Sequence, residues 1–100
     1  MRAYELVQID IKATGENIKR LRIENGFSVK DLQDFFGFSE PQAIYKWQWG
    51  KTLPSIDNFF ALSKLFNTSI DSILVAKDTV IFLIFFILNF LFNDFLFYLY

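Results

Sequence analysis

The segment SEPQAIYKWQWGKTLPS, residues 39–55, carries the start, the apolar face and the end of one short helix. Pro41 suits the first turn of a helix, where its missing N–H leaves no bond unmade, so one of the two residues before it is the cap. Ile44 and Trp47 then fall on one face of the helix. Gly50 readily takes the left-handed conformation that ends helices. The segment predicts an amphipathic helix followed by a loop.

Capping residues and apolar periodicity on both sides of this segment predict four more short helices. The five predicted helices run over about 15–25, 28–36, 40–49, 55–66 and 69–74. The residues predicted to face inward are Ile18, Leu21, Leu32, Phe35, Phe36, Ile44, Trp47, Phe59, Leu62, Leu65, Phe66, Ile70, Ile73 and Leu74. Because each helix has one apolar stripe to bury, the five helices must pack together as a compact all-α bundle.

The composition excludes several classes of protein. The chain has 100 residues, enough for one small domain, and is 53% hydrophobic, which is too apolar for a disordered chain. It contains neither Cys nor His, so disulfides, thiol nucleophiles, Ser-His pairs and the usual zinc sites are excluded. Its Asp and Glu residues form no cluster that favours a carboxylate enzyme. We therefore expect no enzymatic activity, no metal, no cofactor and no small-molecule ligand.

The chain divides into three parts. Val7, Ile9 and Ile11 alternate with polar residues, which predicts an extended arm or short strand over residues 1–13. The helical domain follows over residues 14–77, and a hydrophobic tail fills residues 79–100. The first ten residues carry early charges and no apolar run, unlike a secretory signal, and we expect the helical domain in the cytoplasm.

The segments IKRLRIENGFSVKDLQDFFGFS and AIYKWQWGKTLPSIDNFFALSKLFNTSIDSIL, residues 18–39 and 43–74, resemble the helix-turn-helix family of phage Cro and repressor proteins, also called the Xre family. A Trp followed by Gly, Pro and a long apolar helix is a common pattern in that family. The resemblance implies a compact, five-helix, lambda-repressor-like bundle. It also implies a sequence-specific transcriptional regulator that binds double-stranded DNA, usually as a homodimer on half-sites one helical turn apart.

The chain departs from the family pattern at four places. The turn between the second and third helices is one residue longer than expected, and Gln33 stands where a small residue is usual. We expect the longer turn to make room for that side chain. Arg22 and Gln48 occupy the positions of a common Arg–Glu ion pair, which here becomes a hydrogen bond. Val29 replaces a Gln that usually touches phosphate.

The resemblance places the third helix, residues 40–49, in the major groove with its first residues against base edges. The predicted base contacts are Gln42, Tyr45, Glu40 and Ala43. The amide of Gln42 can pair with N6 and N7 of adenine, and Tyr45 can touch a base edge or a thymine methyl. Glu40 can accept from cytosine, or instead act as the helix cap.

Phosphate contacts are predicted on both sides of the third helix. The candidates are Ser28, Lys30, Lys46, Lys51 and Thr52. Ser28 and Lys30 stand at the start of the second helix, whose free N–H groups attract anions. Alternatively, Lys30 and Lys51 are ordinary surface lysines that face solvent and contact no phosphate. The formal net charge of −1 is not typical of a nucleic-acid binder, but a local basic patch is what meets phosphate.

A second function remains open at this point. The fold can instead serve as a protein-interaction module, in which Tyr45 and Trp49 dock a protein partner such as a toxin and DNA binding has been lost. Trp49 itself has three interpretations, as core edge, dimer contact or DNA contact. Binding that weakens steeply as salt rises distinguishes DNA from a protein partner.

The tail differs sharply from the domain before it, since seven of the 14 phenylalanines follow Thr79 and residues 80–88 are all apolar. At 1.5 Å per residue, 21 helical residues span about 31 Å, the thickness of a bilayer core. Lys77 would lie at one interface and Tyr98 and Tyr100 at the other. The tail therefore predicts a transmembrane helix that holds the domain at the inner face of the cell membrane.

The tail has two other possible origins. An extra core helix is disfavoured, because the tail is apolar on all sides and the domain is too small to surround it. A shifted reading frame remains an alternative, because the residues are mostly Phe, Leu, Ile, Asn and Tyr, the types that AT-rich codons give in any frame. If the tail is an anchor, Asn89 and Asn93 can bond across a pair of such helices.

Overall fold

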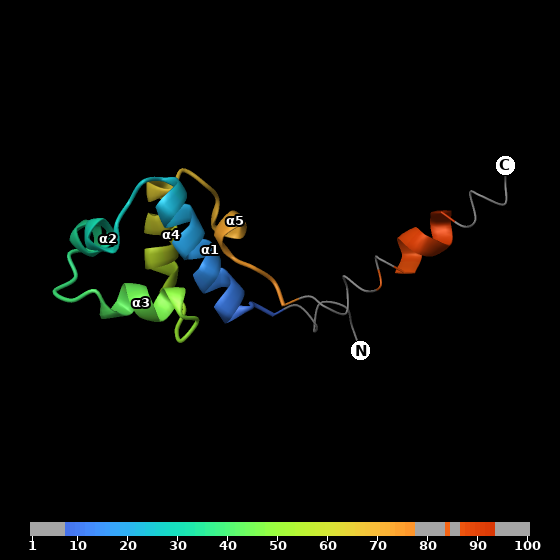
Figure 1. The fold of residues 1–100 in the computed structure, drawn as a ribbon, viewed down its shortest axis with the longest axis horizontal. Coiled ribbons are helices and arrows are strands. Elements are labelled where there is room, and N and C mark those ends of the chain that lie inside the picture. Colours follow the sequence, from blue (N-terminus) through green and yellow to red (C-terminus); the bar gives the residue numbers. More distant parts are fainter. Residues whose placement is uncertain (1–7, 78–83, 85–86, 94–100) are drawn as a thin grey trace. The chain divides into compact units, whose positions relative to one another are not determined.

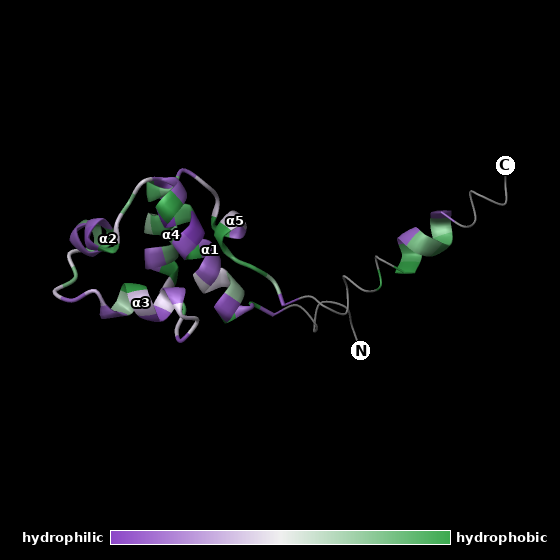
Figure 2. Cartoon of the chain, in the orientation of Figure 1, coloured by the Kyte–Doolittle hydropathy of each residue, from purple (hydrophilic) through white to green (hydrophobic). Residues whose placement is uncertain are grey.

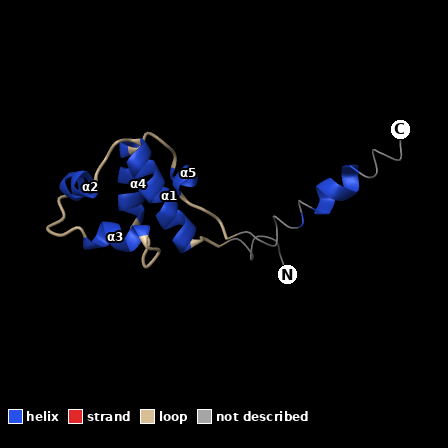
Figure 3. Ribbon diagram, in the orientation of Figure 1, coloured by secondary structure: helices blue, strands red, loops and turns tan. Residues whose placement is uncertain are grey.

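The computed structural model describes residues 8–77, 84 and 87–93 (Figure 1). The helices of its compact unit, which covers Ile9–Val75, are α1 (Ile11–Glu24), α2 (Val29–Phe36), α3 (Gln42–Gln48), α4 (Ile56–Leu65) and α5 (Ile70–Ile73). A further helical segment occupies residues 87–93 (Figure 3). The predicted all-α fold with five helices and a helix in the tail is confirmed.

The first helix begins earlier than the sequence pattern predicted. The carboxylate of Asp10 accepts a hydrogen bond from the backbone N–H of Ala13, at 2.9 Å, and so caps α1. Ile11, expected in the extended arm, is the first residue of the helix, and Gly15 lies inside it. Residues 1–7 of the predicted arm lie outside the described residues, and the division of the chain at residues 13 and 14 remains a prediction.

Three later helices begin with a serine cap, as predicted. The side chains of Ser28, Ser55 and Ser69 each accept a bond from the backbone N–H three residues on. At α2 the carboxylate of Asp31 also accepts from the backbone N–H of Ser28, at 2.8 Å, which completes a capping box. The backbone N–H and then the hydroxyl of Ser28 lower the pKa of Asp31 below its usual range. The capping carboxylate is therefore charged at neutral pH.

The third helix is shorter than predicted. It begins at Gln42, and Pro41 itself takes the capping position with no side-chain bond to the helix. Neither residue before Pro41 caps it, because the N–H groups of Ile44 and Tyr45 bond to the carbonyl of Pro41. At the other end Gly50 has a φ of +71°, and the N–H of Lys51 bonds back to the carbonyl of Lys46 at 2.9 Å.

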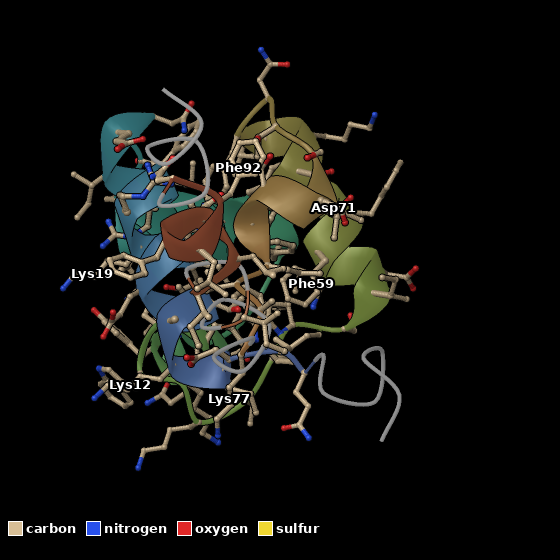
Figure 4. All side chains as sticks on the ribbon, turned by 90° about the vertical axis from the view of Figure 1, so that its right-hand side faces the viewer. Lys12, Lys19, Phe59, Asp71, Lys77 and Phe92 are labelled. Atoms are coloured by element: carbon tan, nitrogen blue, oxygen red, sulfur yellow. The ribbon has the colours of Figure 1, made fainter. Side chains whose placement is uncertain are left out.

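The apolar stripes of the five helices meet in one core. Its buried apolar residues, all predicted, are Ile18, Leu21, Leu32, Ile44, Trp47, Phe59, Leu62, Phe66 and Ile73. Helix α1 packs against α3 and α5, α4 against α5, and α2 against α3. Figure 2 shows hydrophobic and hydrophilic residues alternating along α1 and α4. In Figure 4 the exposed Lys12 and Lys19 project outward from α1, whereas Phe59 lies among other side chains.

One predicted core residue is exposed instead. Phe35 has half of its surface in solvent, whereas its neighbour Phe36 packs against the core. Successive side chains on a helix diverge by about 100°, and here Phe36 faces the core while Phe35 is turned toward solvent. Phe35 contacts Phe36 edge-on, with the ring centroids 5.1 Å apart.

Candidate nucleic-acid interface

Helices α2 and α3 and the turn between them form one end of the bundle (Figure 1). Phe36 at the end of α2 stacks on Phe38 of the turn, with the ring centroids 5.2 Å apart. Both rings meet Trp47 of α3 edge-on, at 5.5 and 5.9 Å. Edge-on and offset contacts of this kind are the favoured arrangements of aromatic rings. This aromatic cluster fixes the angle between α2 and α3.

The turn between α2 and α3 is occupied by the side chains of Gln33 and Phe38. The amide of Gln33 donates to the carbonyls of Phe38 and Ser39, at 3.2 Å each. The turn therefore makes room for Gln33, as expected, and the Gln side chain in return satisfies two carbonyls of the turn. Phe38 lies outside the apolar periodicity of the helices, and its contact with Trp47 depends on the tertiary fold.

The inner side of α3 is held against α1. The Nε of Arg22 donates to the side-chain oxygen of Gln48 at 2.9 Å, and its terminal nitrogen donates to the carbonyl of Phe27, also at 2.9 Å. The predicted replacement of an ion pair by a hydrogen bond is confirmed. Gln48 is 8% exposed. Gly15 lies where a Cβ atom would be 2.0 Å from the carbonyl oxygen of Trp47. The end of α3 therefore has a fixed position.

The outer side of α3 presents four side chains in one stripe. Gln42, Tyr45, Lys46 and Trp49 are all exposed, and their spacing of three, four and seven residues places them within an arc of about 100°. Ala43, a predicted base contact, is half-buried and packs against the core. Glu40 is exposed but lies in the turn before the helix. We call the four exposed residues the α3 stripe.

Tyr45 and Trp49 form a stacked pair within the α3 stripe. Their ring centroids are 5.5 Å apart and their planes are inclined by 23°. Tyr45 is 36% and Trp49 is 62% exposed. The exposure of Trp49 excludes its interpretation as a core residue. The pair was recognisable in the sequence, since residues four apart on a helix are neighbours, but its stacked geometry was not.

Of the predicted phosphate contacts, Ser28 and Lys30 lie at the start of α2, Lys46 belongs to the α3 stripe, and Lys51 and Thr52 follow α3. Ser28 is exposed at the start of α2, and Lys30 pairs with Asp34 at 2.9 Å. Lys30 is still available to a phosphate, because an exposed ion pair at this spacing is weak. Lys46, Lys51 and Thr52 are exposed in α3 and the loop after it. The lysines of this loop and of α3 take no part in either salt bridge of the described residues.

The described residues offer neither a metal site nor a span for a membrane. Within them no group of three acidic side chains comes close enough together to hold a metal ion. Among the same residues no helix is both long and apolar enough to cross a bilayer.

The chain belongs to the helix-turn-helix family of the Xre/Cro type. A sequence model of the family described as "Helix-turn-helix" matches residues 18–73, and this range contains α2 and α3 whole. Among solved structures the fold is similar to the DNA-binding domain of BldD, with a TM-score of 0.56 and 14% sequence identity. That likeness covers 75% of this chain and 100% of the BldD domain. No curated protein matches the chain in sequence.

Proposed function

We propose that the chain is a sequence-specific DNA-binding regulator of transcription that inserts α3 into the major groove. The observation that carries the proposal is the α3 stripe, an exposed row of four long side chains on a helix whose other face is anchored by the buried Trp47. Because its buried face holds the helix rigidly, its exposed side chains can contact base edges with a smaller loss of conformational entropy on binding. Family membership and the solved DNA-binding domain of similar fold agree with this proposal.

The proposed contacts divide into those that specify sequence and those that position the domain. Gln42 begins α3 and is exposed, so its amide is the first candidate for adenine, with Tyr45 one turn further on. Glu40 and Ala43 flank Gln42 and are secondary candidates, Ala43 because it is half-buried. The phosphate contacts proposed are Ser28, Lys30, Lys46, Lys51 and Thr52, of which Lys46 lies within the α3 stripe, and they carry no sequence information themselves.

The regulator is proposed to act as a homodimer. Seven residues of one α3 helix span about 10 Å, enough for only a few base pairs. Two copies on half-sites one helical turn apart would supply the missing specificity. A binding curve that requires two chains per duplex checks this part of the proposal.

Gln42→Ala is expected to weaken binding to the preferred duplex by about 5- to 150-fold, the loss of one bidentate contact to a base. The preferred duplex is obtained by selecting a randomised pool with the full chain, kept in a mild detergent at low salt, and is expected to contain paired half-sites. Affinity is measured by fluorescence anisotropy. Gln8→Ala, which changes another exposed Gln outside the helices, should leave the affinity unchanged. Equal affinities of the two variants would exclude Gln42 as a base contact.

The exposed aromatic pair on α3 also suits a protein partner, so the interaction module is the second candidate function. The same titration separates the two when it is repeated at rising salt. Displacement of counterions by several basic side chains makes the logarithm of the DNA affinity fall by about 0.9 per phosphate contact for each tenfold rise in salt. A folded chain that selects no duplex would favour the interaction module, and Val29 would then mark a lost phosphate contact.

We propose that the tail attaches the regulator to the inner face of the cell membrane. Residues 80–83, 85, 86 and 94–100 lie outside the described residues, but Ile87, Leu88, Phe90 and Leu91 are helical and each more than half exposed. At about 100° per residue these four side chains spread over an arc of about 160°, which makes a broad exposed apolar surface that a membrane can cover.

In a flotation assay, the full chain is expected to rise with phospholipid vesicles, and Leu88→Arg with Leu91→Arg to remain in the dense fraction. Arginine at the centre of a spanning helix opposes insertion by about 2.5–3.5 kcal/mol per residue. Ile23→Arg, a change of another exposed apolar residue, in α1, is the control and should float. A double variant that floats as well as the parent chain would leave the anchor without support.

A further inference from the structure

The stacked pair of Tyr45 and Trp49 is an apolar group on a surface otherwise made for polar contacts. Its members share the α3 stripe with Gln42 and Lys46, so an amide, an ammonium group and two aromatic rings lie within one arc of the helix. Because the two rings are nearly parallel, at 23°, each covers one face of the other and leaves its edge free. The surface that results is flat-sided and restrained by the stack, and its rim is apolar apart from the Tyr45 hydroxyl and the Trp49 indole N–H.

The stack restricts Tyr45 more than it restricts Trp49. Tyr45 is 36% exposed against 62% for Trp49, so the indole shields the phenol ring from one side. A tyrosine alone on a helix surface can rotate about its first side-chain bond, but rotation here would separate the rings and lose their contact. Trp49 therefore selects one orientation of Tyr45, in which the ring stays within the arc that contains Gln42.

The major groove offers one apolar group to such a ring. The donor and acceptor positions of the four base pairs are polar, and the C5-methyl group of thymine is the exception. A polar group placed against an aromatic edge would lose hydrogen bonds to water, whereas a methyl group gains by leaving water. Lys46, adjacent to the pair on the same stripe, adds a charge that suits the phosphates beside a groove and is less suited to an apolar protein partner.

We propose that Tyr45 recognises the C5-methyl group of a thymine in each half-site and that Trp49 is the positioning residue that holds Tyr45 in place. This inference rests on the proposed insertion of α3 into the major groove. It adds to that proposal a base type, a chemical group on the base and a role for Trp49. With Gln42 about one turn closer to the start of α3, the thymine is expected within a few base pairs of the adenine that Gln42 contacts.

The test replaces each thymine of the selected duplex by deoxyuridine, one at a time, which removes only the methyl group and keeps base pairing. The full chain is titrated with each duplex in mild detergent at low salt. One thymine per half-site is expected to lose about fourfold in affinity when its methyl is removed, the value of one buried methyl group. With Tyr45→Ala the ratio of thymine to uracil affinities at that position is expected to fall to about one.

Variants of Trp49 test the positioning role through the same ratio. Trp49→Ala is expected to lower the thymine-to-uracil ratio toward one, and Trp49→Phe, which keeps a stacking ring, to restore it. Phe60→Ala removes a comparably exposed aromatic ring from α4 and should change neither the affinity nor the ratio. Circular dichroism of each variant verifies that the helices are intact, so a changed ratio is not a consequence of unfolding.

The outcomes separate the inference from the function on which it rests. Tight binding of a selected duplex in which no thymine methyl matters would overturn methyl recognition and leave the DNA-binding function standing. A ratio that survives Trp49→Ala would overturn the positioning role. A folded full chain that selects no duplex would overturn the inference together with the proposed function. The aromatic pair would then be interpreted as a contact for a protein partner.

Discussion

Trp47→Ala is expected to lower the free energy of unfolding by about 3–5 kcal/mol, the usual loss when a large buried aromatic side chain is truncated. Trp47 is 4% exposed and meets Phe36 and Phe38 edge-on, so its removal opens a cavity between α2, the turn and α3. Proteins are typically stable by about 5–15 kcal/mol, so this loss would remove a large share of the total stability. The change is measured by urea unfolding followed by circular dichroism.

Trp49→Ala is the matched control, because it removes the same side chain from the same end of α3. Trp49 is 62% exposed and contacts Tyr45 in the α3 stripe, so we expect a loss of about 1 kcal/mol or less. We therefore expect Trp47 to affect the stability of the fold and Trp49 to affect the recognition of thymine. Similar losses of stability in both variants would contradict the burial that distinguishes them.

The number and approximate place of the helices could be predicted, because the signals that set them are local. Ser28, Ser55 and Ser69 each cap a helix as expected, and the apolar spacing identified every residue of the buried core. The start of α1 was missed for a physical reason. Alternation at Val7, Ile9 and Ile11 correctly indicates extended backbone at Ile9 and Asp10, and the N–H of Asp10 bonds to the carbonyl of Val75 at 2.8 Å. The helix nevertheless begins at Ile11, because the carboxylate of Asp10 accepts from the backbone N–H of Ala13.

The residues of the α3 stripe were largely predictable, but the tertiary contacts that hold α3 in place were not. A helical wheel separates the exposed Gln42 from the buried Ile44 without knowledge of the fold, whereas the half-burial of Ala43 depends on neighbours from other segments. The same holds for Phe38, which reaches Trp47 only because the turn folds back. Phe38 lies in a turn, so no helical periodicity marks it in the sequence.

Gly15→Ala is expected to destabilise the fold by about 3 kcal/mol, the upper end of the usual cost of overpacking a core. Helix propensity alone predicts the opposite, a gain of about 1 kcal/mol from replacing Gly by Ala inside a helix. The difference arises from α3. A Cβ atom on Gly15 would lie 2.0 Å from the carbonyl oxygen of Trp47 and 3.0 Å from that of Gln48, and both are backbone atoms that cannot rotate away.

To accommodate the added methyl group, the end of α3 would have to move away from α1. Such a movement would strain the bond from Arg22 to Gln48 and displace Trp49, so Gly15→Ala should also weaken binding to the selected duplex. Thermal unfolding and duplex titration of the full chain measure the two effects, with Glu16→Ala, the exposed neighbouring position on α1, as the control that should alter neither. A Gly15→Ala chain as stable as its parent would mean that α1 and α3 do not approach as closely as the structure places them. Loss of duplex affinity with full helix content would instead show that this one close approach sets the position of the recognition surface.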